Sequence, residues 1–191
     1  MVKKGMNGLK QLEPIRKQED ILKMYEVLKR ISTRDYLFFK FAIHTGLKLT
    51  HLLNLTVADI LDSNDEVVPE WYESHASHIR IQLPQTLRHE LKAFVEDHHM
   101  TEASLLFQSK RTKKGLSRQQ AYRIISKPAK ELGLERVGIT TLRKTFAYHA
   151  YKSGISIAII QKYLGHQTPN ETIKFICINP FKKTTTIALN L

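Results

Sequence analysis

Residues 140–175 constrain the fold more than any other stretch, because the pattern there predicts three short helices in succession with sharp boundaries. The first predicted helix carries Arg143 near its start, and the pair Gly165-His166 follows the second. The third begins with Thr-Pro-Asn-Glu at 168–171, which combines a capping-box pattern with proline at the first helical position. Such helices bring side chains from distant parts of the chain together, so the function depends on which side chains those are.

The chain before this stretch is also mostly helical by its pattern of apolar residues. Apolar residues recur at helical spacing in five segments, namely 18–31, 34–45, 49–55, 86–98 and 117–132. Segments 67–72 and 78–83 instead suit strands, since Ile79, Ile81 and Leu83 alternate with polar residues. We therefore predict an α+β fold that is mostly helical, with a small antiparallel β-sheet.

No repeat or low-complexity linker divides the 191 residues, and 42% apolar content is enough for one hydrophobic core. We predict a single domain over 15–178. A flexible basic lead is expected at 1–14. The C-terminal tail at 179–191 is expected either to be exchanged between protomers or to pack on its own chain or stay disordered.

The charge of the chain points to a polyanionic partner. Thirty Lys and Arg residues against 18 Asp and Glu give a net charge of +12, which is typical of proteins that bind nucleic acid. A basic loop at 110–115 leads into the helix predicted from Ser117, where Gln120 completes a capping box. Phosphate contacts are predicted for the cations of this region, namely Arg111, Lys113, Lys114, Arg118 and Arg123. The alternative is an ordinary solvated surface.

Other classes of protein are disfavoured by composition. The single cysteine, Cys177, excludes an internal disulfide bond and a cysteine-based zinc site. The histidines show no spacing typical of metal ligands, so we expect neither a metal nor a cofactor. No apolar run approaches the roughly 18 residues of a membrane span. We expect a cytoplasmic, nucleoid-associated protein of a bacterial or phage-infected cell.

Three landmarks occur in an order that identifies a family. They are Thr-Gly-Leu-Lys at 45–48 ahead of a leucine-rich helix, Thr-Thr-Leu-Arg at 140–143 running into Thr-Phe, and Leu-Gly-His at 164–166. With these landmarks the chain resembles the catalytic domain of the tyrosine recombinase, or phage integrase, family. The resemblance implies the fold of that catalytic domain.

Members of this family cut DNA when a tyrosine oxygen attacks a backbone phosphate and forms a covalent phosphotyrosine. That chemistry requires a nucleophile, cations that hold the phosphate, and groups that donate or accept protons. The resemblance implies that Arg143 is the second family arginine and that His166 is a hydrogen-bond donor to the same phosphate. Lys48 stands at the first arginine and keeps its charge without the planar fork. Lys144, next to Arg143, is assigned to the DNA-binding set with these residues.

The remaining family positions are changed. The tyrosine position holds Phe175, whose phenyl ring has no oxygen, and the histidine position holds Thr140. The usual acidic residue three positions after the first arginine is replaced by His51. The hairpin segment 74–77, where the family lysine belongs, contains no lysine. The nearest tyrosine before Phe175 is Tyr163, which we expect to pack inside.

This pattern predicts a protein that binds double-stranded DNA without cleaving it, as a regulator or accessory factor of a phage or other mobile element. A homo-oligomer or a companion recombinase is a possible partner. One alternative is a recombinase that is active with unusual residues or is a Tyr-to-Phe variant. A second is a helix-turn-helix repressor that uses 156–175, with base contacts at 171–174.

Overall fold

The computed structural model describes residues 11–109, 111–112 and 114–178. In chain order its elements are α1 (Gln18–Ile31), α2 (Thr33–Thr45), α3 (Leu49–Asn54), β1 (Glu70–Trp71), the 3-10 helix η1 (Ser74–Ala76), β2 (Ile81–Gln82), α4 (Gln85–Asp97), α5 (Arg118–Glu131), α6 (Ile139–Lys152), α7 (Ile157–Leu164) and α8 (Pro169–Phe175). The fold is mostly helical with one small antiparallel sheet, as the sequence predicts.

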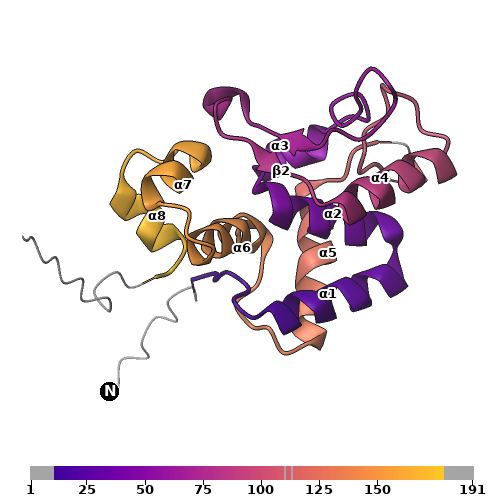
Figure 1. The fold of residues 1–191 in the computed structure, drawn as a ribbon. Helices are drawn as coiled ribbons and strands as arrows, with labels where there is room; N and C mark the ends of the chain where they lie inside the picture. The colour runs from indigo at the N-terminus through magenta and orange to yellow at the C-terminus, as the bar shows by residue number, and fades with distance from the viewer. Residues whose placement is uncertain (1–10, 110, 113, 179–191) are drawn as a thin grey trace, which may run out of the picture.

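Helix α2 is the centre of the larger core. Its side chains are buried on nearly every side, and Phe38, Phe39 and Phe41 are fully buried. A helix that is hydrophobic all round must lie inside a domain. Figure 1 shows α2 in the middle of the larger part of the molecule, with α1 on one side and α3 and the strands on the other. The aromatic run in this helix is therefore core.

A smaller core joins α6, α7 and α8, which Figure 1 shows gathered on one side of the molecule. Its buried members are Ala76, Ala147, Ile160, Tyr163, Leu164 and Ile176. Helix α6 also contacts α2 and α5, so it connects the two cores. The three short helices predicted from the sequence are thus held against the body of the protein by α6 and by the contact of α7 with η1.

The sheet is shorter than predicted. Only Glu70 with Gln82 and Trp71 with Ile81 are paired, in antiparallel register. Pro69 precedes this pair and lacks a backbone N–H, so it cannot extend the ladder as a donor, although its carbonyl accepts from the Leu83 N–H at 2.8 Å. The connection is not a tight hairpin turn, because η1 lies between the strands.

The helices predicted between residues 18 and 132 are confirmed, with ends that agree to within one residue. Residues 11–14 were expected in the flexible lead, yet Pro14 is buried and the Glu13 N–H donates to the Arg136 carbonyl at 2.9 Å. The predictions for 1–10, for Lys113 and for the tail at 179–191 lie outside the described residues. None of the helices in the described ranges combines the length and the hydropathy needed to cross a membrane.

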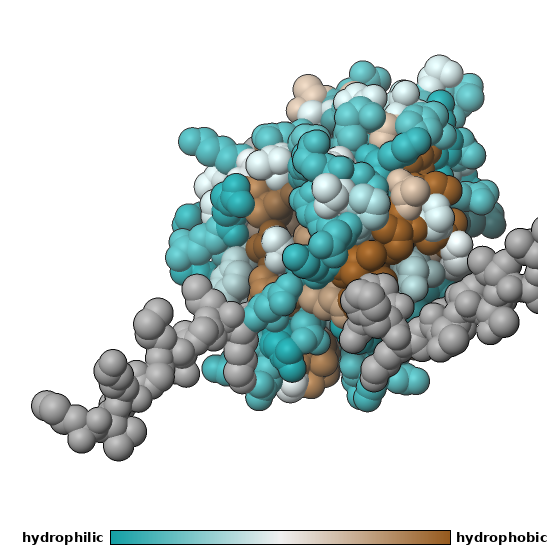
Figure 2. Space-filling model, turned by 90° about the vertical axis from the view of Figure 1, so that its left-hand side faces the viewer, coloured by the Kyte–Doolittle hydropathy of each residue, from teal (hydrophilic) through white to brown (hydrophobic). Residues whose placement is uncertain are grey.

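An open apolar groove lies between β2 and the helices α6 and α7. Its volume is about 470 Å³, and its apolar lining includes Ile79, Ile81 and Phe146. Ile155 and Ile159 stand at this groove and are 42% and 45% exposed. Figure 2 looks onto the side of the molecule where Figure 1 shows α7 and α8, and apolar residues emerge there between hydrophilic ones.

Candidate functional site

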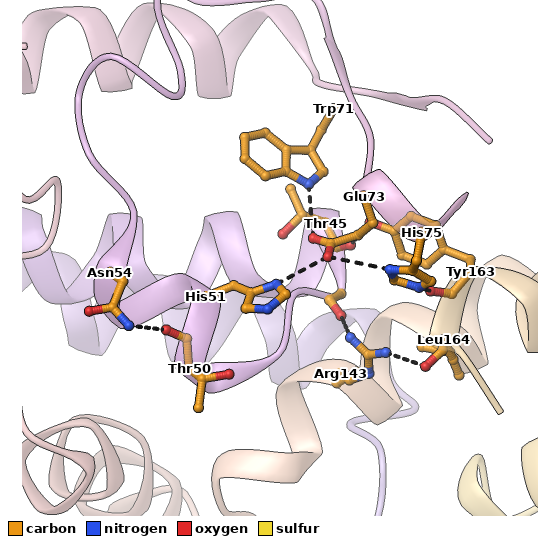
Figure 3. A network of polar contacts seen from close by, with 11 residues as sticks. Thr45, Thr50, His51, Asn54, Trp71, Glu73, His75, Arg143, Tyr163 and Leu164 are labelled. Atoms are coloured by element: carbon orange, nitrogen blue, oxygen red, sulfur yellow. Dashed lines mark hydrogen bonds and ion pairs between the residues drawn. The ribbon is translucent and has the colours of Figure 1, made fainter. Parts of the chain in front are cut away.

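Arg143 lies near the start of α6 and joins two helix ends. One terminal nitrogen of its guanidinium donates to the Gly46 carbonyl at 2.6 Å and the other donates to the Leu164 carbonyl at 2.7 Å (Figure 3). Carbonyls at helix C-termini lack intrahelical donors and carry the negative end of the helix dipole, so a guanidinium is a fitting partner. Burial lowers the pKa of Arg143, while Tyr163 and Glu73 act in the opposite direction. The guanidinium nevertheless stays protonated at neutral pH.

Glycines make both of these helix ends possible. Gly46 ends α2 with φ of 63° and Gly165 ends α7 with φ of 70°, both in the left-handed region. A Cβ atom at residue 46 would lie only 2.3 Å from Cδ1 of Phe146. Gly46 is therefore required both by the turn and by the close packing of Phe146.

His166 follows α7 and faces α8. Its Nδ1 lies 3.0 Å from the Thr172 hydroxyl oxygen. Burial lowers the pKa of His166, Glu171 opposes this, and the positive charges of Arg143 and Lys48 lower the pKa further. Lys48, Arg143 and His166 come from three separate parts of the chain, and the structure brings them within electrostatic reach of one another.

Phe175, which the sequence resemblance assigns to the tyrosine position, lies beside this cluster. Its ring contacts the His166 ring edge-on, with centroids 5.0 Å apart. Tyr163 offers no substitute hydroxyl, because the side chain is buried and its OH donates to the Thr45 carbonyl. Burial also raises the pKa of the Tyr163 hydroxyl. The predicted inward packing of Tyr163 is confirmed.

Thr140 is exposed in the first turn of α6. It precedes Arg143 by three residues on the same helix, so the two share one side of α6. A threonine hydroxyl there can donate a hydrogen bond but does not titrate near neutral pH as imidazole does.

Lys144 does not lie where the sequence led us to expect it. The side chain is buried, its Nζ is 3.5 Å from Cys177 Sγ, and the ammonium lies 5.0 Å from the centre of the Phe175 ring. Adjacent residues on an α-helix point about 100° apart, which takes Lys144 away from the side of Arg143. We therefore withdraw the DNA contact assigned to Lys144.

The cations around α5 lie on the surface. Arg111, Lys114, Arg118 and Arg123 are all exposed. The capping box at Ser117 is complete, because the Ser117 hydroxyl accepts from the Gln120 N–H at 3.1 Å and the Gln120 amide oxygen accepts from the Ser117 N–H at 2.8 Å. This box fixes the first turn of α5, which carries Arg118.

The capping box predicted for α8 is only half formed. The Thr168 hydroxyl accepts from the Glu171 N–H at 3.1 Å, but the Glu171 carboxylate accepts from Gln167 N–H at 2.8 Å, one residue earlier than in a box. Thr172 is buried against His166, while Glu171 and Lys174 are exposed. Helix α8 thus packs inward through part of its surface.

The sequence did not predict that Glu73 is part of this site, where its carboxylate is buried. Its oxygens accept from His51 Nδ1 at 3.1 Å and from the Trp71 indole at 3.5 Å (Figure 3). His75 Nδ1 lies 3.9 Å from the same carboxylate, and the other ring nitrogen of His75 is 2.9 Å from the Tyr163 carbonyl. The signal available in the sequence was His51, which stands where the resemblance implies an acidic residue.

No metal site is formed by the described side chains, since no three His, Cys, Asp or Glu residues among them lie close enough to hold an ion. The chemistry of the cluster is instead that of an anion site. Two cations and an imidazole converge there, and the guanidinium keeps N–H groups beyond the two that bind carbonyls.

Comparisons with known proteins point to one family. The Phage integrase family matches residues 16–180. The chain is 36% identical over 168 residues to "Probable integrase/recombinase YoeC" of Bacillus subtilis, covering 88% of this chain and 91% of that protein. It is 30% identical over 156 residues to "Tyrosine recombinase XerA" of Pyrococcus furiosus, covering 81% of this chain and 54% of that protein.

Among solved structures, the XerH site-specific recombinase bound to difH substrate is similar, with a TM-score of 0.67 and 20% identity. The similarity covers 91% of this chain and 53% of XerH. The chain thus spans nearly all of the Bacillus protein but about half of the two Xer proteins. With its catalytic-domain fold and a family match over most of its length, the chain belongs to the phage integrase family.

Proposed function

We propose that this protein binds double-stranded DNA without cleaving it and serves as a regulator or accessory factor of a phage or mobile element. One observation carries the proposal. Arg143 and His166 converge beside the ring of Phe175, so the groups that hold a phosphate are assembled around a side chain that cannot attack it.

The proposed contact is electrostatic and hydrogen-bonded. Arg143 is held rigidly by the carbonyls of Gly46 and Leu164, so its remaining N–H groups are already oriented when a phosphate arrives. Lys48 is exposed at the start of α3 and adds a second cation. Nucleophilic attack, by contrast, has no oxygen at Phe175 from which to start.

Two further observations support DNA as the partner. The net charge of +12 and the exposed Arg118 and Arg123 on α5 suit the phosphate backbone of a duplex. The similar XerH structure is a complex with its difH substrate. The chain would then place α5 and α6 toward the duplex.

A second candidate is a site-specific recombinase that is active with unusual residues or that is a Tyr-to-Phe variant. It is supported by the relative named as a probable integrase/recombinase, which is similar over 91% of its own length. Under this reading the cluster of Lys48, Arg143 and His166 still serves strand cleavage.

Covalent trapping separates the two candidates. The full chain and its Phe175→Tyr variant are incubated with nicked suicide duplexes from the host element, and binding and covalent adducts are measured on the same samples. We expect binding by both proteins and no adduct with either. Phe175→Tyr restores only the nucleophile, whereas the family histidine at Thr140 and the family lysine in segment 74–77 are still missing. Arg143→Ala removes the proposed phosphate contact and is expected to weaken binding at least about tenfold.

A covalent adduct with the wild-type chain would overturn the proposal, and an adduct with Phe175→Tyr alone would favour the Tyr-to-Phe variant. If the proposal holds, cleavage at a shared site requires a companion recombinase. Adding an intact recombinase from the same element to the binding reaction then tests whether this chain changes the cleavage rate.

A further inference from the structure

His51 stands beside the phosphate-binding cluster on the solvent side. It lies one helical turn after Lys48, and its backbone N–H donates to the Lys48 carbonyl at 3.0 Å. Residues three apart on a helix are neighbours on its surface. The His51 side chain is 53% exposed, so its imidazole can reach a ligand that contacts Lys48.

Glu73 orients this imidazole from the protein side. The Glu73 side chain is only 5% exposed, and its carboxylate lies 3.1 Å from His51 Nδ1. A carboxylate accepts hydrogen bonds, so Nδ1 carries the hydrogen and Nε2 is the nitrogen that gains or loses a proton. Within the described residues, no protein group bonds to His51 Nε2. Figure 3 shows Glu73 between His51 and His75.

Several charges act on His51. Glu73 places a negative charge 3.1 Å from His51 Nδ1, and the cation Lys48 lies one helical turn before His51. His75 Nδ1 lies 3.9 Å from the same Glu73 oxygen, and His166 is the other histidine near Lys48 and Arg143. A phosphate bound by Lys48 and Arg143 would add negative charge beside this imidazole, and a nearby negative charge favours the protonated form of a histidine.

We propose that His51, positioned by Glu73, is a further DNA-phosphate contact that binds its phosphate as the imidazolium, so that DNA binding takes up a proton. The acidic position of the family holds His51 in this chain, and the carboxylate comes from Glu73 instead. Glu73 is a positioning residue and does not itself touch DNA. This inference rests on the proposed DNA binding.

By linkage, a proton taken up on binding makes affinity increase as the pH falls. The full chain is titrated onto a labelled duplex by fluorescence anisotropy from pH 5.5 to 8.5 at constant ionic strength. We expect affinity to decrease by about tenfold across this range, since uptake of one proton changes affinity by at most about tenfold per pH unit and only near the pH at which the histidine titrates. His51→Gln should remove most of this response and bind at all pH values about as the wild type does at pH 8.5.

Three further variants separate the sources of the response. Glu73→Gln should move the midpoint of the pH response to lower pH, because it removes the charge that favours the imidazolium. His166→Gln measures the contribution of the other histidine in the cluster. His89→Gln, an exposed histidine on α4, is the matched control and should leave the response unchanged.

The outcomes are distinguishable. Absence of DNA binding by the wild type at every pH would contradict the proposed function itself. Binding whose pH response survives in His51→Gln would contradict only this inference, as would an unchanged midpoint in a folded Glu73→Gln protein. Because His51 is exposed, its variant is expected to fold even if the Glu73 variant does not.

Discussion

At the scale of single residues, Arg143 of one landmark is held in place by Gly46 of another. The guanidinium of Arg143 reaches a carbonyl at Gly46, and the glycine gives the chain the left-handed turn that presents this carbonyl. The same glycine admits the ring of Phe146, which also packs against Tyr163 with ring centroids 5.2 Å apart. The site is thus held by backbone geometry as much as by side-chain chemistry.

Substitution of this glycine should therefore destabilise the protein severely. Gly46→Ala incurs about 1–2 kcal/mol for the left-handed backbone and about 1–3 kcal/mol more for overpacking against Phe146. Gly133→Ala is the matched control, because Gly133 has φ of 71° but nothing lies within 4 Å of its added Cβ. Urea denaturation measures both variants. Equal losses at the two positions would contradict the packing argument.

At the scale of elements, the short helices depend on their ends and on their neighbours. Helices of 6 to 8 residues, such as α3, α7 and α8, are too short to be stable alone. Helix α5 has 14 residues and a complete capping box, whereas α7 is capped by a longer bond from the Ile159 N–H to the Ser156 hydroxyl at 3.4 Å. The cap of α5 is thus expected to be stronger than the cap of α7, and stability measurements can test this difference.

Ser117→Ala should lower the free energy of unfolding by about 1 kcal/mol, because it removes one acceptor for an unpaired N–H in the first turn of α5. The same variant should weaken DNA binding a few-fold, since fraying of that turn releases Arg118. Ser156→Ala removes the longer bond and should cost less stability and leave DNA binding unchanged. Thermal denaturation and fluorescence anisotropy measure whether Ser117→Ala has the larger effect. A larger effect of Ser156→Ala would contradict this prediction.

At the scale of the whole molecule, positive charge is the dominant surface property. The net charge of the chain is +12, and its exposed cations include Arg111 and Lys114 before α5, Arg118 and Arg123 on α5, and Lys48 near Arg143. Contacts of this kind release counterions from DNA, so their strength depends on salt.

We expect DNA affinity to fall by about three or more decades between about 50 and 200 mM salt if six or more phosphates are engaged. Replacing both Arg118 and Arg123 with Gln should reduce the slope of log Kd against log salt by about 2. Lys23→Gln, an exposed cation on α1, is the control and should leave the slope unchanged. A flat salt response of the wild type would contradict DNA binding through the phosphate backbone.

The sequence by itself determined the features that depend on neighbouring residues. Helical spacing, the glycine ends and the complete cap at Ser117 were all predictable, because each is decided within a few residues. The three landmarks also predicted the convergence of Lys48, Arg143 and His166, since their order identifies a known arrangement.

Only the tertiary structure decided the contacts between distant residues. Arg143 reaches Gly46 across 97 positions, and His75 reaches Tyr163 across 88. The burial of Lys144 and the carboxylate of Glu73 at His51 likewise follow from which surfaces pack together. Local patterns carry the period of a helix or strand, but a partner from elsewhere in the chain is selected by packing, and no local pattern encodes it.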